Sequence, residues 1–265
     1  MSRIERVERF RELHRTGTFV MPNEHDLGST KLLESIGFEA IATTSAGLAN
    51  TLGKLDSSVS RDALVDHVRS ICAATDLPLN VDAERCYPDQ PGGVTATIEM
   101  LADAGASGCS IEDWNPVDGR IESIDLAVER VAEAVAAADR VGLVLTARAE
   151  NHIRGVTDID DTVLRLRRYA DVGATCVYAP GLVDPALIER VVVETAVAVN
   201  VLLFPTGPSV ADLAALGVRR ISVGSFLASI AYGAFTQAAQ RLHDDGTIAP
   251  DAPFLTGETS KLAFG

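Results

Sequence analysis

The stretch AGASGCSIED, residues 104–113, contains the pattern that decides the fold. A glycine follows the end of a predicted helix, and an apolar run leads from it into a pair of carboxylates. Glycine just past a helix can adopt the left-handed conformation that ends the helix, and a short apolar run after it is typical of a buried strand. The same pattern recurs as IGFEAIATTS at 36–45, VGATCVYAPG at 172–181 and LGVRRISVGS at 216–225. Because strands that alternate with helices pair in parallel, the pattern predicts an α/β fold.

Reading the intervening stretches in the same way gives eight strand–helix units. The predicted strands are 18–21, 40–44, 79–81, 109–111, 143–147, 176–178, 201–204 and 221–223, and the predicted helices are 29–35, 61–74, 94–104, 124–138, 159–172, 185–195, 210–216 and 226–244. Eight units favour a (β/α)₈ barrel of the TIM type over a doubly wound open sheet, which usually has fewer strands and a glycine-rich turn after the first. We expect one barrel domain at 1–244. An irregular tail at 245–265 is expected to pack on the barrel or on a neighbouring subunit.

The composition excludes several classes of protein. The 265 residues suit a single barrel. A formal net charge of −14, without any run of Lys or Arg, argues against a nucleic-acid partner. No window approaches the roughly 18 apolar residues of a membrane span, so no membrane partner is expected. Four single cysteines without a CxxC pair are typical of a reduced, cytoplasmic protein that lacks structural zinc.

Two acidic residues follow the strand predicted at 79–81. Asp82 and Glu84 are two positions apart in LNVDAER, and on an extended segment they would project to the same side. Carboxylates that close repel each other unless a proton or a divalent cation lies between them. With only oxygen donors nearby, Mg²⁺ is the best match, and Mn²⁺ is an alternative. A salt bridge from either carboxylate to Arg85 or Arg148 is the competing interpretation.

Further candidates follow the neighbouring strands, where barrel enzymes carry their catalytic groups. Adjacent strand residues point to opposite faces, so we expect Glu112 to face the ion and Asp113 to cap the next turn. Arg148 can neutralise the carboxylates or bind a substrate carboxylate through two hydrogen bonds. The small residues of TTSAGLAN, 43–50, allow backbone N–H groups to approach an anion. Asp56 is a candidate for contact with a metal or its water.

At this point the chain resembles the isocitrate lyase and phosphoenolpyruvate mutase superfamily, in its short bacterial branch. The matching segments run in family order to about residue 242. They are MPNEHDLGSTKLLESIGFEAIATTSAGLANTLGKLD, LPLNVDAE, AGASGCSIED, TARAE, YAPGLVD and PSVADLAALGVRRISVGS. Each segment alone is weak evidence, whereas the ordered set is highly specific.

The resemblance implies a barrel whose last helix is swapped between the subunits of a homodimer or homotetramer. It also implies that Asp82 binds Mg²⁺ directly, while Asp56, Glu84 and Glu112 act on the water shell of the ion. The resulting site is therefore expected to comprise catalytic residues Arg148, Glu112 and Asp56, substrate-binding residues Thr44, Ser45, Ala46, Gly47, Leu48, Asp82 and Arg148, and metal-site residues Asp82, Glu84 and Glu112.

The departures from the family pattern bear on the reaction. Isocitrate and methylisocitrate lyases carry a KxCGH loop after the fourth strand, whereas residues 114–123 read WNPVDGRIES and contain no Cys, His or Lys. The general acid of those lyases is therefore missing, and Cys86, in another loop, is a weak substitute. Glu84 stands where the family often has Asp, and His25 replaces a Trp common in this branch.

These residues favour a Mg²⁺-dependent carbon–carbon lyase that acts on a small 2-oxo or 2-hydroxy diacid through a metal-stabilised enolate. Decarboxylation of an oxaloacetate-like substrate fits best, because a metal ion can stabilise the enolate without a strong acid. Cleavage of a 2-hydroxy diacid is nearly as well supported. The alternatives are a phosphonopyruvate-type P–C mutase or hydrolase and a non-catalytic barrel that binds a metabolite.

Overall fold

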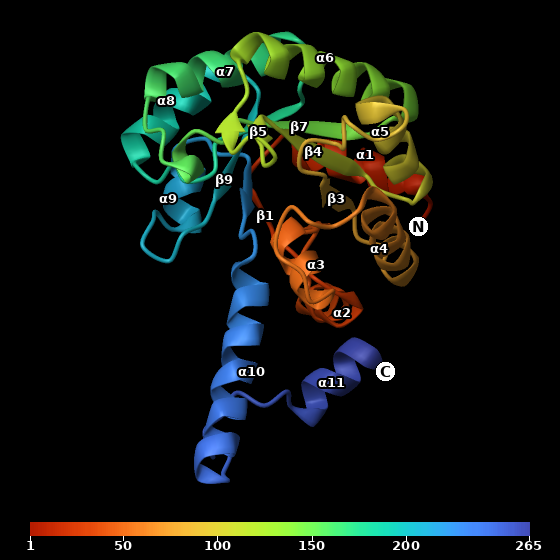
Figure 1. Ribbon diagram of the computed structural model, residues 1–265, viewed down its shortest axis with the longest axis vertical. Helices are drawn as coiled ribbons and strands as arrows, with labels where there is room; N and C mark the ends of the chain where they lie inside the picture. The colour runs from red at the N-terminus through yellow and green to blue at the C-terminus, as the bar shows by residue number, and fades with distance from the viewer.

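Eight parallel strands form the centre of the molecule in the computed structural model, which describes residues 1–265 (Figure 1). They are β1 (Phe19–Met21), β2 (Ile41–Ala42), β3 (Leu79–Asp82), β4 (Gly108–Glu112), β7 (Val144–Arg148), β8 (Cys176–Tyr178), β9 (Ala198–Leu202) and β10 (Arg220–Ser222). The order is β1-β10-β9-β8-β7-β4-β3-β2, and a parallel bridge between Asn23 and Ala42 joins the two ends. The predicted (β/α)₈ barrel is confirmed.

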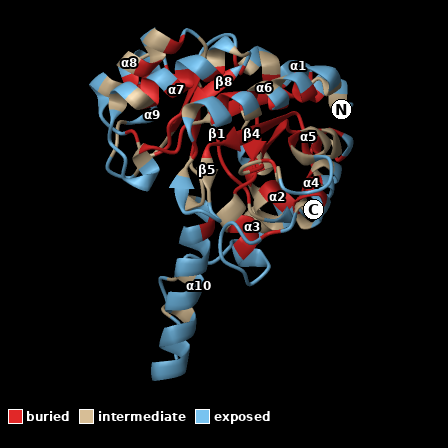
Figure 2. Cartoon of the chain, turned by 45° about the horizontal axis from the view of Figure 1, so that its top comes forward, coloured by how far each residue is buried: buried red, intermediate tan, exposed pale blue.

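Helices surround this barrel, and most of them bury one face against it. They are α1 (Arg3–Leu13), α2 (Leu27–Ile36), α3 (Ser45–Thr51), α4 (Arg61–Ala74), α5 (Gly93–Asp103), α6 (Ile124–Val141), α7 (Ile159–Asp171), α8 (Pro185–Thr195), α9 (Val210–Ala215), α10 (Phe226–Asp245) and α11 (Gly257–Phe264), with a 3₁₀ turn, η1 (His152–Arg154). In α6, the buried residues Ala127, Val131, Ala134 and Ala138 recur at helical spacing. Figure 2 shows the resulting buried layer between helices and strands.

Helix α1 closes the end of the barrel where the strands begin. Arg3 donates to the carbonyl oxygens of Ala106 and Val141, which precede β4 and β7. At the other end of the helix, burial and the nearby Arg220 lower the pKa of His14 to about 3. The neutral ring can therefore accept from Arg220 at 3.2 Å. The carboxyl ends of the strands are the end that stays open.

Three local predictions differ from the structure. The strand predicted at 40–44 is shorter, because Thr44 already caps α3 and accepts from the amide of Gly47 at 3.4 Å. The strand predicted at 201–204 begins earlier, at Ala198. A two-stranded hairpin, β5 (Trp114–Asn115) and β6 (Arg120–Ile121), occupies the loop after β4.

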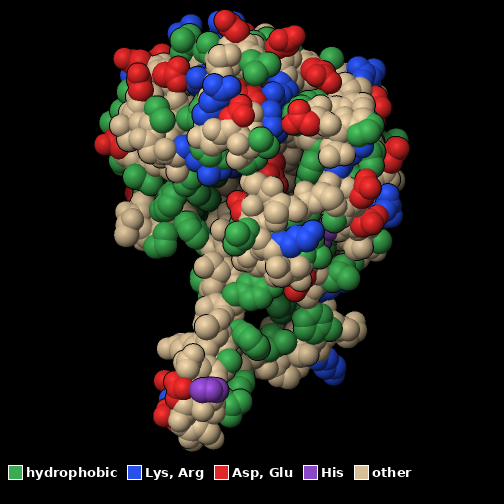
Figure 3. Space-filling view, in the orientation of Figure 1, with side chains coloured by type: hydrophobic (Ala, Val, Ile, Leu, Met, Phe, Trp, Pro, Cys, Tyr) green, Lys and Arg blue, Asp and Glu red, His purple; other side chains and the backbone are tan.

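The long helix α10 extends away from the barrel. Figure 1 shows α10 projecting from the barrel, and Figure 3 shows apolar side chains on this extension. Only Ala228 of α10 is buried, whereas Ile230 and Phe235 are 66% and 71% exposed. The tail expected to be irregular contains α11, which packs on α2. None of the helices combines the length and the apolar character needed to cross a membrane.

Candidate active site

A cavity of about 230 Å³ opens at the carboxyl ends of the strands. Six of the predicted site residues line it, and they come from the ends of β2, β3 and β7 and from the loop before α4: Thr44, Ser45, Ala46, Asp56, Asp82 and Arg148. The other four do not line it: Gly47 and Leu48 are buried within α3, Glu112 is buried, and Glu84 lines a separate depression of about 130 Å³. The cavity therefore gathers most of the candidates, but not all of them.

Arg148 is the centre of the charge network at this site. Its Nη1 donates to Asp82 Oδ1 at 2.7 Å, and its Nη2 lies 3.1 Å from Glu112 Oε2 and 2.8 Å from Glu150 Oε1. Burial opposes the charged form, yet Glu150, Glu112 and Asp82 hold the pKa of Arg148 well above its usual value. One guanidinium thus serves three carboxylates, and the site has an excess of negative charge.

Asp82 is held in place by the elements on either side of it. Its backbone N–H donates to Thr43 Oγ1 at 2.8 Å, and its Oδ2 accepts from the backbone N–H of Ser45 at 3.2 Å. Its other oxygen accepts from Arg148, so the side chain has a fixed orientation at the end of β3.

The backbone conformation of Glu84 differs from the one that the sequence predicts. The strand ends at Asp82 and Glu84 has φ 49°, so the expected extended segment with both side chains on one side is wrong. A residue other than glycine rarely adopts this left-handed conformation, which is often found at functional sites. Burial, together with the negative charges of Asp82 and Asp56, raises the pKa of Glu84 to about 7. The three carboxylates are therefore electrostatic neighbours.

The pair after β4 divides between the two faces of the barrel wall, as the alternation predicts. Glu112 meets Arg148 inside the barrel, and burial followed by the charge of Glu150 raises its pKa well above the usual value. Asp113 points outward and accepts from Tyr169 Oη at 2.7 Å and from Arg165 Nη1 at 3.1 Å. The expected turn cap at Asp113 is therefore wrong, because its side chain ties β4 to α7.

The carboxylates suit a hydrated divalent cation. Nowhere do three Asp, Glu, His or Cys side chains converge into a direct metal cage. Mg²⁺ needs only one or two carboxylates because it keeps several waters, and Asp82 with Asp56 and Glu84 nearby meets that requirement. Burial raises the pKa of Glu84, and the neighbouring charges of Asp82 and Asp56 add to the rise; a bound cation would offset the repulsion among these carboxylates. The competing salt bridge is formed in part: Arg148 pairs with Asp82 at 2.7 Å, whereas Arg85 pairs with Glu122 at 2.8 Å instead of with Asp82 or Glu84.

The segment 44–48 forms only part of the expected anion pocket. The amide of Leu48 donates to the carbonyl of Thr44, and the amide of Gly47 donates to Thr44 Oγ1, because both residues lie in the first turn of α3. A Cβ at Gly47 would lie 2.4 Å from Thr44 Cγ2 and 3.0 Å from His25 Cβ, so close packing requires the glycine. Ser45 and Ala46 remain at the cavity wall.

The structure adds lining residues that were not among the predicted site residues. Glu150, Arg154 and Tyr178 line the cavity. Burial raises the pKa of Tyr178 to about 12, so its phenol keeps a proton at neutral pH. The signal that could have found the first two was the charged run RAENHIR directly after β7. Cys86 is fully buried and its pKa is raised well above the usual value, so it is not exposed to the cavity as an acid.

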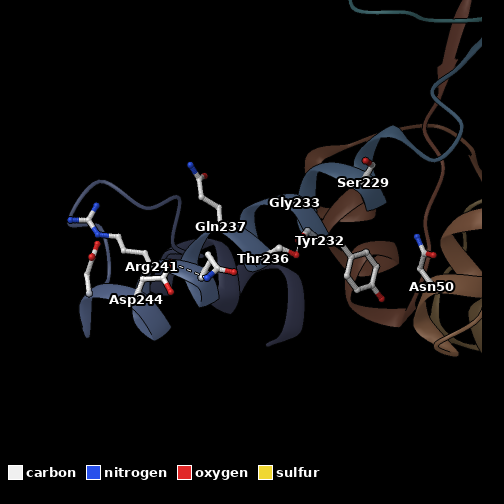
Figure 4. A pocket seen from close by; sticks show the side chains of 10 residues that line it. Asn50, Ser229, Tyr232, Gly233, Thr236, Gln237, Arg241 and Asp244 are labelled. Carbon is white, nitrogen blue, oxygen red and sulfur yellow. Dashed lines mark hydrogen bonds between the residues drawn. The ribbon is translucent and has the colours of Figure 1, made fainter.

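A second depression, of about 860 Å³, follows the projecting helix (Figure 4). Polar residues of α10, such as Gln237 and Arg241, line it together with Asn50. It lies away from the strand ends and shares no residue with the charged cavity. We therefore place the candidate active site at the charged cavity.

The fold and this cavity define a (β/α)₈ barrel whose charged residues meet at the carboxyl ends of the strands, where barrel enzymes carry their catalytic groups. The family model of phosphoenolpyruvate phosphomutase matches residues 10–243. The chain belongs to the isocitrate lyase/phosphoenolpyruvate mutase superfamily, a group of lyases, mutases and hydrolases.

Individual relatives agree with this assignment. The structure of a presumed lyase/mutase from Burkholderia cenocepacia J2315 superposes with a TM-score of 0.93 at 42% identity, covering 99% of this chain and 97% of that one. An uncharacterized protein of Mycobacterium tuberculosis is 31% identical over 92% of this chain and 93% of its own length. A phosphonopyruvate hydrolase complex with oxalate and Mg²⁺ shares the fold, with a TM-score of 0.83 at 23% identity over 99% of this chain and 95% of that one. Weaker relatives include proteins named 2-methylisocitrate lyase and oxaloacetate decarboxylase.

Proposed function

We propose that the chain is a Mg²⁺-dependent lyase that breaks a carbon–carbon bond of a small 2-oxo or 2-hydroxy diacid. Decarboxylation of an oxaloacetate-type substrate is favoured, and Mn²⁺ is an alternative ion. The observation that carries the proposal is a carboxylate cluster paired with Arg148 in a cavity whose lining contains no Cys, His or Lys. Membership of a catalytic superfamily supports an enzyme rather than a binding protein.

Each residue has a distinct task in this proposal. Asp82 would hold the ion directly, and Asp56, Glu84 and Glu112 would bind its water ligands. Mg²⁺ bound there supplies the positive charge that stabilises an enolate oxygen. Arg148 holds the substrate carboxylate beside Asp82, and the small side chains of Thr44, Ser45 and Ala46 leave room for it.

The lack of a strong proton donor favours decarboxylation within the lyase class. The bond from the third carbon to its carboxylate breaks, CO₂ leaves, and the electron pair moves to the 2-oxo oxygen to give an enolate. Water can protonate the third carbon, so no Cys, His or Lys is required. Cleavage of a 2-hydroxy diacid needs in addition a base for its hydroxyl proton, which makes it the second choice within the class.

A substrate panel tests the reaction. The protein is incubated with Mg²⁺ and oxaloacetate, 2-methylisocitrate, 2,3-dimethylmalate or phosphonopyruvate, and pyruvate, CO₂ and phosphate are followed. We expect the protein to release pyruvate and CO₂ from oxaloacetate faster than free Mg²⁺ does without protein. If Asp82→Ala left that rate and its Mg²⁺ dependence unchanged, the metal assignment would be wrong.

Two other functions remain as outcomes of the same panel. Phosphonate chemistry is favoured by the match to the phosphoenolpyruvate phosphomutase model, and phosphate release or isomerisation of phosphonopyruvate would identify it. Tight oxalate binding without turnover of any substrate would identify a barrel that binds a metabolite.

We also propose that α10 docks on another subunit of a homodimer or homotetramer. Its exposed Ile230, Phe235 and Leu242, with Phe254 and Leu262 beyond it, would otherwise leave a large apolar surface in water. Light scattering on the purified protein should give a dimer or tetramer, and Ile230→Glu with Phe235→Glu should give a monomer. A monomeric unmodified protein would contradict the proposal.

A further inference from the structure

Besides Arg148 and the fully buried Arg220, a third arginine, Arg154, lines the candidate active site, from the loop after β7. It ends the turn η1 and lines the charged cavity beside Ile153. Its side chain is 34% exposed, and it lies within 4.0 Å of one carboxylate oxygen, Glu150 Oε2 at 3.5 Å. No hydrogen bond from its guanidinium to the protein is formed in the structure, so its N–H groups are available to a ligand.

The charge balance around Glu150 leaves Arg154 undercompensated. Glu150 is buried, and its Oε1 already accepts from Arg148 Nε at 3.1 Å and Nη2 at 2.8 Å. Arg148 has two further carboxylate partners, whereas Arg154 has only its share of Glu150. A carboxylate of a ligand would complete the pairing of Arg154, because a guanidinium binds carboxylates through two parallel hydrogen bonds.

The position of Arg154 is fixed from two sides. Its guanidinium lies 4.2 Å from the ring centroid of Trp114, a cation–π stack that restricts the plane of the fork. Gly181, with φ 87°, packs against the same turn so closely that a Cβ there would lie 2.7 Å from the amide nitrogen of Ile153. The fork is thus held before any ligand binds, which lowers the entropic cost of using it.

We propose that Arg154 is the specificity residue that recognises the remote carboxylate of a diacid whose 2-oxo or 2-hydroxy end lies at Asp82 and Arg148. This inference rests on the proposed function and deepens it, since it selects diacids over monoacids. The shared Glu150 places the two guanidinium groups next to each other, one for each end of a short diacid. Because Trp114 belongs to the β5–β6 hairpin, its stack on Arg154 connects the proposed carboxylate-binding residue to this hairpin. The hairpin follows β4, where the related lyases carry their KxCGH loop.

The test compares ligands that differ only by the remote carboxylate. Malate is lactate with one added carboxylate, and oxalate occupies the metal end alone. Each is titrated into the full-length protein with Mg²⁺, by calorimetry and by tryptophan fluorescence. Trp114 is the only tryptophan of the chain, so the fluorescence reports directly on the stack.

We expect Arg154→Ala to weaken malate binding by about 10- to 100-fold, the usual effect of losing hydrogen bonds to a charged group. The affinities for oxalate and lactate should change by less than about threefold. Arg154→Lys should recover part of the malate affinity, because lysine keeps the positive charge but lacks the two parallel N–H donors of arginine. Arg120→Ala is the matched control. Arg120 lies on the same β5–β6 hairpin as Trp114, but its side chain is 74% exposed and pairs with Asp118. It should change none of the affinities.

Two results would overturn the inference alone, with oxalate binding intact in the unmodified protein. Either malate affinity survives Arg154→Ala, or malate and oxalate weaken by the same factor. If the unmodified protein with Mg²⁺ binds neither oxalate nor malate, the proposed function fails and the inference fails with it.

Discussion

Replacing Glu84 by glutamine should make the metal-free protein more stable, and increasingly so as the pH rises. Burial and the charges of Asp82 and Asp56 raise the pKa of Glu84 from 4.5 to about 7 in the folded state. Below pH 4.5 the carboxyl is protonated in both the folded and the unfolded chain, so it does not lower the free energy of unfolding. Between pH 4.5 and 7 the unfolded chain loses this proton while the folded chain keeps it, so stability falls with rising pH. Above pH 7 the cost reaches about 3 kcal/mol, from the difference between the two pKa values.

The assay is urea unfolding of Glu84→Gln and the unmodified protein in EDTA, at one protein concentration, followed by Trp114 fluorescence. We expect the two free energies of unfolding to agree near pH 4.5 and the variant to gain about 2 to 3 kcal/mol by pH 8. Glu129→Gln, which removes an exposed carboxylate from α6, is the control and should show no such trend. A gap between Glu84→Gln and the unmodified protein that is independent of pH, or that narrows as the pH rises, would refute the electrostatic account.

Three further predictions concern other parts of the site. Tyr169→Phe removes the 2.7 Å hydrogen bond to Asp113 and should lower the free energy of unfolding by about 1.5 to 3 kcal/mol, measured in urea; an unchanged value would contradict a role for this bond. Gly181→Ala should lower the free energy of unfolding by more than about 1 kcal/mol because of the positive φ at this position, and it should weaken malate binding. Asp82→Asn should abolish the Mg²⁺ dependence of oxalate binding in calorimetry, and an unchanged dependence would exclude Asp82 as the ligand.

Regular periodicity made the barrel predictable from the sequence. Repeated glycine-ended helices and apolar runs placed all eight strands, with errors of a few residues at their ends. Strand alternation also assigned Glu112 to the inside and Asp113 to the outside correctly, because both lie at the end of a regular strand. These predictions depend on local geometry that is the same in every parallel sheet.

The less regular parts of the site could not be read in this way. The left-handed conformation of Glu84 has no sequence signal, since it is not a glycine or an asparagine. The small residues of α3 suggested a loop, whereas Thr44 caps a helix there. The charged run RAENHIR was the only local sign of Arg154, because its stack on Trp114, 40 positions earlier in the chain, follows no local pattern.

The position of α1 has a consequence for the order of events in catalysis. Helix α1 closes the barrel where the strands begin, and its Phe10 is fully buried beneath them. Ligands therefore enter and leave the cavity at the opposite end, where the strands finish. Substrate and product must then use the same passage in turn. A product that stays bound blocks the next substrate, so inhibition by product-like acids should be competitive. The β5–β6 hairpin contacts the cavity wall through the stack of Trp114 on Arg154.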